Sequence, residues 1–222
     1  MNILVYPFTD ARGIDKYFKT IYVGWSNQNK AMMFLDPSDV RHQPLKYLDS
    51  QTVLSICLLG HCDRGSELLR SETSYLADET DQAEGKTATA AQIVHLLTNL
   101  GMTNSTRTRI KCLNCDSGAF AHEFDEFGQS FASRLKERLN GSGFGDITVI
   151  GYIGSLTLIP NKVPPDVPHR KFAIIDTEHG KKAFPGSNLK VNVEGNYDKD
   201  AATEQTAMQK ILNFSGETGI KL

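Results

Sequence analysis

Two short runs of mostly apolar residues constrain the fold of this chain more than any other feature. Residues 53–60 (VLSICLLG) and 108–114 (TRIKCLN) each have the length of a strand, and the first run is almost continuously apolar. Such a run is typical of a central strand in a parallel sheet whose two faces are both covered. His61 follows the first run and Cys115 follows the second. Because open α/β sheets carry their chemistry at the carboxyl ends of their strands, we expect both side chains at one edge of the sheet.

The segment between the two runs has the pattern of an amphipathic helix. Thr87 or Thr89 is placed to cap this helix, and its apolar stripe consists of Ile93, Leu96, Leu97 and Leu100. A second amphipathic helix at 128–139 follows, and then a strand, a glycine-marked bend and a strand at 147–159. Residues 53–153 therefore alternate between strand and helix, which predicts a parallel α/β sheet with right-handed crossovers.

The remaining segments extend this core at both ends. They are a strand at 2–7, a hairpin or two short strands at 21–25 and 31–35, a turn-rich segment with a short helix at 36–50, a polar loop at 62–87, a hairpin around residues 177–180 and a final helix at 198–214. We expect a single domain over residues 1–222, with a core motif region at 50–155 and a C-terminal hairpin plus helix at 170–214.

The composition excludes several classes of protein. The chain has 222 residues, 40% of them hydrophobic, and a formal net charge of −2. No basic bias argues for a nucleic-acid partner, and no polybasic block argues for a membrane surface. No run approaches the roughly 18 apolar residues that a membrane span needs. We therefore expect no nucleic-acid partner and no membrane.

The cysteines and the N-terminal residues bear on the compartment. Cys57, Cys62, Cys112 and Cys115 all lie in or beside the two apolar runs, which argues against a disulfide framework and favours a reducing compartment. The opening residues MNILVYPFTDARG are typical of a first strand and not of a cleavable signal peptide. The expected location is the cytoplasm, or outside the cell after export without a cleavable signal.

The histidine and the cysteine at the strand ends supply the parts of a nucleophilic site. A thiol becomes a useful nucleophile beside a base, and His61 can both activate Cys115 and protonate a leaving amine. The reaction also needs donors to the oxyanion. The predicted donors are the backbone N–H groups of Cys115 and of Cys62, which directly follows His61.

These residues resemble the two motifs of a known family. An apolar block ending in His-Gly, followed by one ending in a small residue and Cys, is the shared signature of the caspase-like (clan CD type) cysteine peptidases, which include caspases, clostripains and toxin cysteine protease domains. LSICLLGHC at 54–62 and RIKCLNC at 109–115 resemble these blocks. The interval of 54 residues between His61 and Cys115 is close to the roughly 50 found in caspases. The resemblance covers residues 50–155 and implies a three-layer α/β/α sandwich on a mostly parallel sheet.

Carried over by position, the resemblance makes His61 and Cys115 the catalytic dyad. It also places Tyr152, in the GYIG segment, beside the substrate groove. Asp63 and Asp116 directly follow the two motifs, and each is a candidate to orient a cation on the substrate, or else a solvated carboxylate or a turn cap. The family needs no metal or organic cofactor.

Two positions depart from the family pattern and leave alternatives open. Cys62 stands where the family usually has glycine, and Asn114 stands where it usually has a small residue. One alternative is an inactive pseudo-peptidase that binds protein. Another is a zinc site made by the C-x-x-C of Cys112 and Cys115 with His61 and Cys62. The position of Cys112 inside an apolar strand argues against zinc, and the poor helix start after Cys115 argues against a redox C-x-x-C.

A few other charged residues are weaker candidates. His122 competes with His61 as the partner of Cys115, whereas His95 packs on a helix or faces solvent. The basic residues at 169–171 and at 181–182 are candidates to contact an anionic activator or form a solvated hairpin.

The sequence thus predicts a cysteine endopeptidase that cleaves protein or peptide substrates through a thioester, such as a bacterial effector. The acidic loop at 63–86 is expected to flank the groove as a lid, a self-cleavage segment or a specificity loop.

Overall fold

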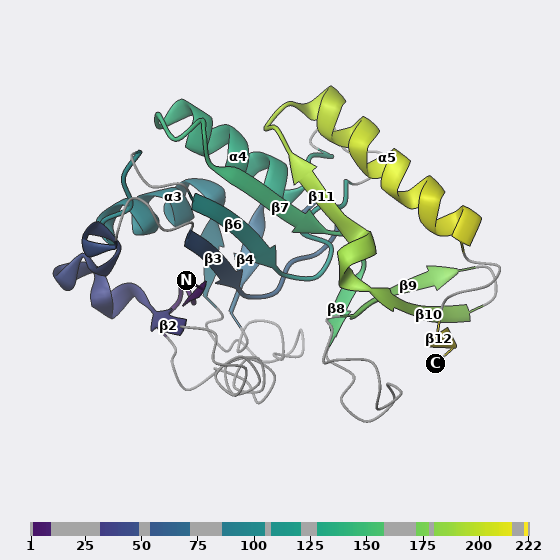
Figure 1. The fold of residues 1–222 in the computed structure, drawn as a ribbon, viewed down its shortest axis with the longest axis horizontal. Helices are drawn as coiled ribbons and strands as arrows, with labels where there is room; N and C mark the ends of the chain where they lie inside the picture. The colour runs from purple at the N-terminus through teal and green to yellow at the C-terminus, as the bar shows by residue number, and fades with distance from the viewer. Residues whose placement is uncertain are drawn as a thin grey trace.

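The computed structural model in Figure 1 describes most of the chain. The described residues are 2–9, 32–48, 54–71, 86–104, 108–120, 128–157, 172–177, 180–214 and 220–221. The predicted strand at 21–25, the middle of the polar loop at 72–85, the alternative base His122 and the basic residues at 169–171 lie outside them. The predictions for these segments stay predictions.

Within the described residues, six strands form a mostly parallel sheet at the centre of the molecule (Figure 1). Their order is β11-β7-β6-β3-β1-β2, and β11 alone is antiparallel to its neighbour. In that order they span Lys190–Val193, Thr148–Tyr152, Thr108–Leu113, Leu54–Leu59, Asn2–Val5 and Met32–Leu35. The predicted parallel sheet is confirmed, and the two apolar runs are neighbouring strands at its centre.

Helices α3 (Ala90–Asn99) and α4 (Phe131–Gly141) pack against each other on one face of this sheet (Figure 1). Because β3, β6 and β7 follow one another in one direction across the sheet, right-handed crossovers place both connecting helices on the same face. Of the two predicted caps, Thr89 is the one that begins α3, and it forms a capping box with Gln92. Ser130 caps α4, so this helix begins three residues later than predicted.

Two predicted segments have a different structure. The short helix expected at 36–50 consists of two 3-10 turns, η2 (Pro37–His42) and η3 (Pro44–Tyr47). The polar loop expected at 62–87 contains strand β4 (Leu68–Arg70), which pairs antiparallel with β5 (Thr87–Thr89). The prediction of a continuous loop at 63–86 is therefore wrong at residues 68–70, whereas β5 begins directly after this range. Three-residue strands are too short to show a periodicity in the sequence.

A second, antiparallel sheet and helix α5 form the C-terminal part of the described chain. The sheet order is β12-β10-β9-β8, and these strands span Ile220–Lys221, Gly180–Pro185, Phe172–Thr177 and Ser155–Thr157. The predicted hairpin is the β9–β10 pair, and η4 (Gly186–Leu189) follows it. Helix α5 (Tyr197–Phe214), predicted at 198–214, packs on β11. Strand β11 itself was not predicted.

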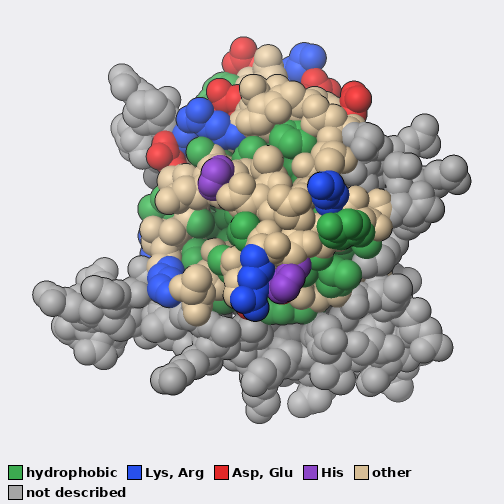
Figure 2. Space-filling view, turned by 90° about the vertical axis from the view of Figure 1, so that its left-hand side faces the viewer, with side chains coloured by type: hydrophobic (Ala, Val, Ile, Leu, Met, Phe, Trp, Pro, Cys, Tyr) green, Lys and Arg blue, Asp and Glu red, His purple; other side chains and the backbone are tan. Residues whose placement is uncertain are grey.

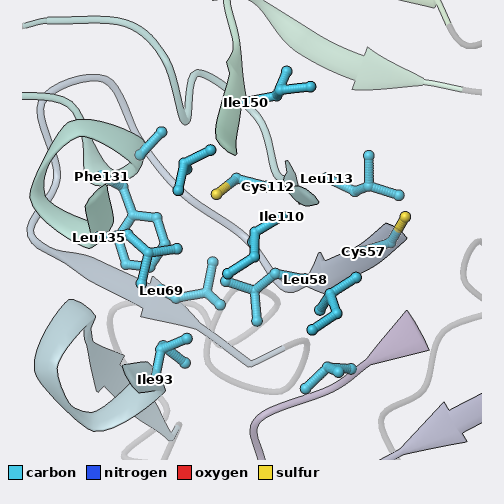
Figure 3. Packing of buried hydrophobic residues seen from close by; sticks show 14 of the residues in the cluster. Cys57, Leu58, Leu69, Ile93, Ile110, Cys112, Leu113, Phe131, Leu135 and Ile150 are labelled. Carbon is cyan, nitrogen blue, oxygen red and sulfur yellow. The ribbon is translucent and has the colours of Figure 1, made fainter. Parts of the chain in front are cut away.

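The core lies between the central sheet and helices α3 and α4. Figure 3 shows Phe131 and Leu135 of α4 beside Cys112 of β6, whereas Cys57 and Leu113 point to the other side of the sheet. This follows from the alternation of side chains along a strand. Residue 58, not residue 57, is the register partner of residue 112. Cys57 and Cys112, the two buried cysteines within these strands, therefore occupy opposite faces of the sheet.

The surface carries charges of both signs. Figure 2 shows the side of the molecule that lies at the left of Figure 1, where basic, acidic and apolar side chains are interspersed and the acidic ones gather toward the upper rim. Among the helices that the structure describes, none has the length and apolar character needed to cross a membrane.

Candidate active site

His61 and Cys115 occupy equivalent positions at the ends of two adjacent parallel strands. Each residue of β3 pairs with the residue of β6 that lies 54 positions later in the chain, and the last pair is Leu59 with Leu113. The same interval separates His61 from Cys115, and each lies two residues beyond the last pair. The sheet therefore carries both residues at one edge, as the sequence predicted from the two apolar runs.

A side-chain amide joins the two strand ends just before these residues. Nδ2 of Asn114 donates to the carbonyl oxygen of Gly60 at 2.9 Å and approaches that of Leu58 at 3.4 Å. Asn114 is only 1% exposed. A small residue at this position has no such donor, so the departure from the family pattern supplies a tie between β6 and β3.

The backbone of His61 is fixed by a bridge to the strand that follows it. His61 and Arg70 exchange backbone hydrogen bonds of 2.9 and 2.8 Å. Gly60, just before, has a φ of +151°, and a Cβ there would lie 2.7 Å from Cγ of Leu69. Only glycine accommodates this bend without strain, so the chain turns at Gly60 to bring His61 against β4.

The loop after Cys115 is anchored to the turn between β7 and β8. Asp116 has a φ of +49°, and its Oδ1 accepts a hydrogen bond from the N–H of Gly154 at 2.8 Å. The Ser117 hydroxyl donates to the carbonyl of Cys112 at 2.9 Å and accepts from the N–H of Tyr152 at 3.1 Å. These contacts fix the backbone on which the Cys115 side chain is carried.

The two loops that carry the site are also joined to each other. The N–H of Gly65 donates to the carbonyl of Ala119 at 3.1 Å. Glu204 of α5, which sequence reasoning did not single out, contacts both loops through Arg64 and the N–H of Phe120. The sequence did contain a sign that Glu204 faces inward. It lies three and four residues before Ala207 and Met208 in a predicted helix, and both of these apolar residues are partly buried.

Cys115 is the most accessible of the four cysteines. All four cysteines are free thiols, and the other three are buried. Burial raises the pKa of the Cys115 thiol above its ordinary value, and Asp116 and Asp63 raise it further. Backbone N–H groups of Leu156 and of Cys115 itself stabilise the thiolate and act in the opposite direction. The net effect is a thiol that holds its proton in the free protein.

Both predicted oxyanion donors lie at the strand ends. Within the described part of the chain, neither the N–H of Cys62 nor that of Cys115 donates to a backbone carbonyl. Cys62 is also not among the described residues with positive φ, so its side chain causes no strain where the family usually has glycine. Its thiol is buried and donates toward the carbonyl oxygen of Asp63 at 3.4 Å.

The three residues predicted to border the substrate have other contacts. Tyr152 is 2% exposed, and burial raises the pKa of its phenol, so its position gives no support to a role in lining a groove. Asp63 is exposed and lies 3.4 Å from Arg70 in an ion pair. Asp116 supports the turn at Gly154. Both carboxylates nevertheless act on the Cys115 thiol.

The arrangement does not favour the zinc alternative. Among the residues that the structure describes, no group of three His, Cys, Asp or Glu side chains is placed to hold a metal ion. Cys112 points into the core beside Phe131 and Leu135 (Figure 3), as expected for a residue inside a strand.

Comparison with protein-family models finds no match for this chain, and comparison with curated proteins finds no relative. The functional argument therefore depends on the geometry of the site.

Proposed function

We propose that this protein is a cysteine endopeptidase of the caspase-like type, with Cys115 as the nucleophile and His61 as its base and acid. The observation that carries the proposal is their equivalent position, two residues beyond the ends of adjacent parallel strands. A mostly parallel sheet with α3 and α4 on one face is compatible with the three-layer α/β/α sandwich of that family.

The reaction proceeds in two steps. Sγ of Cys115 attacks the carbonyl carbon of the scissile peptide, and the thiol proton passes to the imidazole of His61. The tetrahedral oxyanion accepts hydrogen bonds from the N–H groups of Cys62 and Cys115. The C–N bond breaks, the amine leaves with the proton from His61, and a thioester remains. Water then adds to the thioester with His61 as base, and the acid product and the Cys115 thiol are released.

The raised pKa of Cys115 determines how this reaction begins. Because the free protein holds the thiol in its protonated form, proton transfer accompanies attack on a bound substrate. A substrate that brings a positive charge near Asp63 and Asp116 would offset the effect of these carboxylates on the pKa of the thiol. No metal or organic cofactor takes part in the proposed steps.

A pseudo-peptidase that binds protein without cleaving it is the second candidate function. The observation that favours it is the same raised thiol pKa, because an activated cysteine usually has a depressed one. The proposed partner is a protein or peptide in either case. The proposal for the active enzyme includes three further points. They are self-cleavage within 63–86, a role as a bacterial effector and a reducing compartment.

The test measures the reactivity of Cys115. Intact-mass labelling with limiting iodoacetamide, from pH 6 to 9, is compared for the wild type, Cys115→Ala, His61→Ala and a matched control, His95→Ala. His95 is exposed on α3 and contacts Asn99. We expect the first label at Cys115, slower labelling in His61→Ala and wild-type labelling in His95→Ala.

A peptide-library digest then separates the two candidate functions. For the active enzyme we expect cleavage that falls by about 10²–10⁴-fold in His61→Ala and disappears in Cys115→Ala. Labelling of Cys115 that does not depend on His61, together with no cleavage, would reject the peptidase and favour the binding protein.

A further inference from the structure

A buried carboxylate on α5 contacts both loops of the candidate site. Glu204 is 0% exposed, and its Oε2 accepts a hydrogen bond from the N–H of Phe120 at 3.2 Å. Its Oε1 lies 3.9 Å from Nη1 of Arg64. Arg64 is three residues after His61, and Phe120 is five residues after Cys115. One side chain of a distant helix therefore contacts the loop that follows each proposed catalytic residue.

The helix that carries Glu204 is firmly anchored at its start. The buried carboxylate of Asp200 accepts hydrogen bonds from the Ser133 hydroxyl of α4 and from the backbone N–H groups of Glu194, Gly195 and Asn196. The ring of Tyr197 packs edge-on against Phe120, with centroids 5.6 Å apart. Movement of either loop relative to α5 would therefore break contacts with a fixed element.

The burial of Glu204 makes this contact specific. A carboxylate away from water is costly unless charge and hydrogen bonds compensate it, and Arg64 and the Phe120 N–H supply both. The side chain of Arg64 is 39% exposed, so its charge remains partly solvated while it faces the buried oxygen. Loss of the charge on one partner leaves the other without its compensation.

We infer that Glu204 is a positioning residue, which holds the loops after His61 and Cys115 in the relative position that the dyad requires. This inference rests on the proposed function. The hydrogen bond from Gly65 to Ala119 gives the two loops a second, direct connection, so loss of Glu204 loosens the pair and does not separate it.

The test compares variants that alter the charge with variants that keep it. Glu204→Gln retains an acceptor for the Phe120 N–H but lacks the charge, Arg64→Gln removes the other charge, and Arg64→Lys keeps it. The matched control is Glu194→Gln, which removes an exposed carboxylate that pairs with Lys199 at 3.0 Å. The rate of Cys115 labelling is measured against pH, with amide hydrogen exchange at Gly65 and Phe120.

We expect Glu204→Gln and Arg64→Gln to slow labelling of Cys115 by about tenfold, because small displacements of catalytic groups are costly. Their pH profiles should approach that of His61→Ala. Arg64→Lys should restore the wild-type profile, and Glu194→Gln should match it. Because Arg64 and Glu204 act as a pair, the double variant Arg64→Gln/Glu204→Gln should label Cys115 no more slowly than either single variant.

The outcomes separate this inference from the proposed function. Wild-type rates and profiles in both Gln variants would overturn the positioning role, as would faster exchange of both amides with unchanged labelling. If Glu204→Gln does not fold, the comparison of Arg64→Gln with Arg64→Lys decides. If Cys115 is labelled in His61→Ala at the wild-type rate, the proposed dyad is wrong. The positioning role is then wrong as well, even if amide hydrogen exchange shows that Glu204 orders the two loops.

Discussion

The side-chain amide of Asn114 donates a 2.9 Å hydrogen bond to the carbonyl oxygen of Gly60. These residues directly precede Cys115 and His61, so the bond joins the two strand ends at the last position before the proposed dyad. It extends the β3–β6 pairing by one position beyond the backbone register, which ends at Leu59 and Leu113. The relative position of the dyad is thus fixed by a side chain as well as by the sheet.

Substitutions of Asn114 should lower the free energy of unfolding, and Asn114→Asp should lower it more than Asn114→Ala. Asn114→Ala loses the bonds to β3 but also removes Oδ1, which has no partner among the described residues, so we expect a loss of about 1 kcal/mol. Asn114→Asp places a carboxylate against two carbonyl oxygens and should cost about 3 kcal/mol. Urea unfolding of the three proteins measures both changes. Equal stability of the two variants would contradict the role of the donor.

Gly60→Ala should lower the free energy of unfolding more than the same substitution at Gly180, where an added Cβ would meet no other atom. At Gly60 the Cβ would meet Leu69 at 2.7 Å in a backbone conformation that alanine rarely adopts, whereas Gly180, at φ +97°, has no atom within 4 Å of an added Cβ. We expect a loss of about 2–4 kcal/mol at Gly60, from strain plus overpacking, and about 1 kcal/mol at Gly180. Thermal or urea unfolding tests the difference. Similar losses at both sites would show that the clash with Leu69 is relieved by repacking.

Asp116→Asn should make Cys115 more reactive. The amide keeps an acceptor for the Gly154 N–H, and asparagine tolerates the positive φ at this position. It removes a negative charge that raises the pKa of the Cys115 thiol. The pKa should therefore fall, and labelling of Cys115 at pH 8 should become severalfold faster. The thiolate absorbance at 240 nm against pH gives an independent reading, with Asp39→Asn on η2 as a remote control.

The stability of the protein should fall above about pH 8.5, in reducing buffer. Burial raises the pKa of the Cys112 thiol, so above the unfolded value of about 8.5 the unfolded chain loses a proton that the folded chain keeps. The free energy of unfolding then falls by up to about 1.4 kcal/mol per pH unit for each such thiol. Cys62 acts in the same direction and Lys136, whose pKa is lowered, in the opposite one.

The contribution of Cys112 is isolated by comparison with Cys112→Ala, because this variant retains Cys62 and Lys136. Urea unfolding at pH 7.5 and 9.5 should give a smaller fall with pH for the variant than for the wild type. An equal fall would mean that Cys112 titrates alike in the folded and unfolded states.

Local patterns carried the prediction of the central elements. The apolar run at 53–60 contains β3, and the segment with the Thr89 cap and the apolar stripe forms α3. Few other secondary structures would bury a continuous or periodic set of apolar residues. The antiparallel strand β11 escaped prediction, because its alternation of exposed and buried residues extends over only four positions. Its identity as a strand depends on the free edge of β7, whose paired residues lie 38 to 44 positions earlier in the chain.

Local sequence patterns were enough to predict the strand and helix order of residues 53–153, the parallel sheet and the positions of His61 and Cys115 beyond two of its strands. These features depend on short-range periodicity and on the handedness of crossovers. Three contacts could be found only from the folded chain: Asn114 joins the strand ends, Asp116 supports Gly154, and Glu204 contacts both loops. Each of these contacts joins residues between 38 and 140 positions apart. Such pairings leave no periodic trace in the sequence, because a single polar side chain can satisfy its hydrogen bonds with many partners until packing selects one.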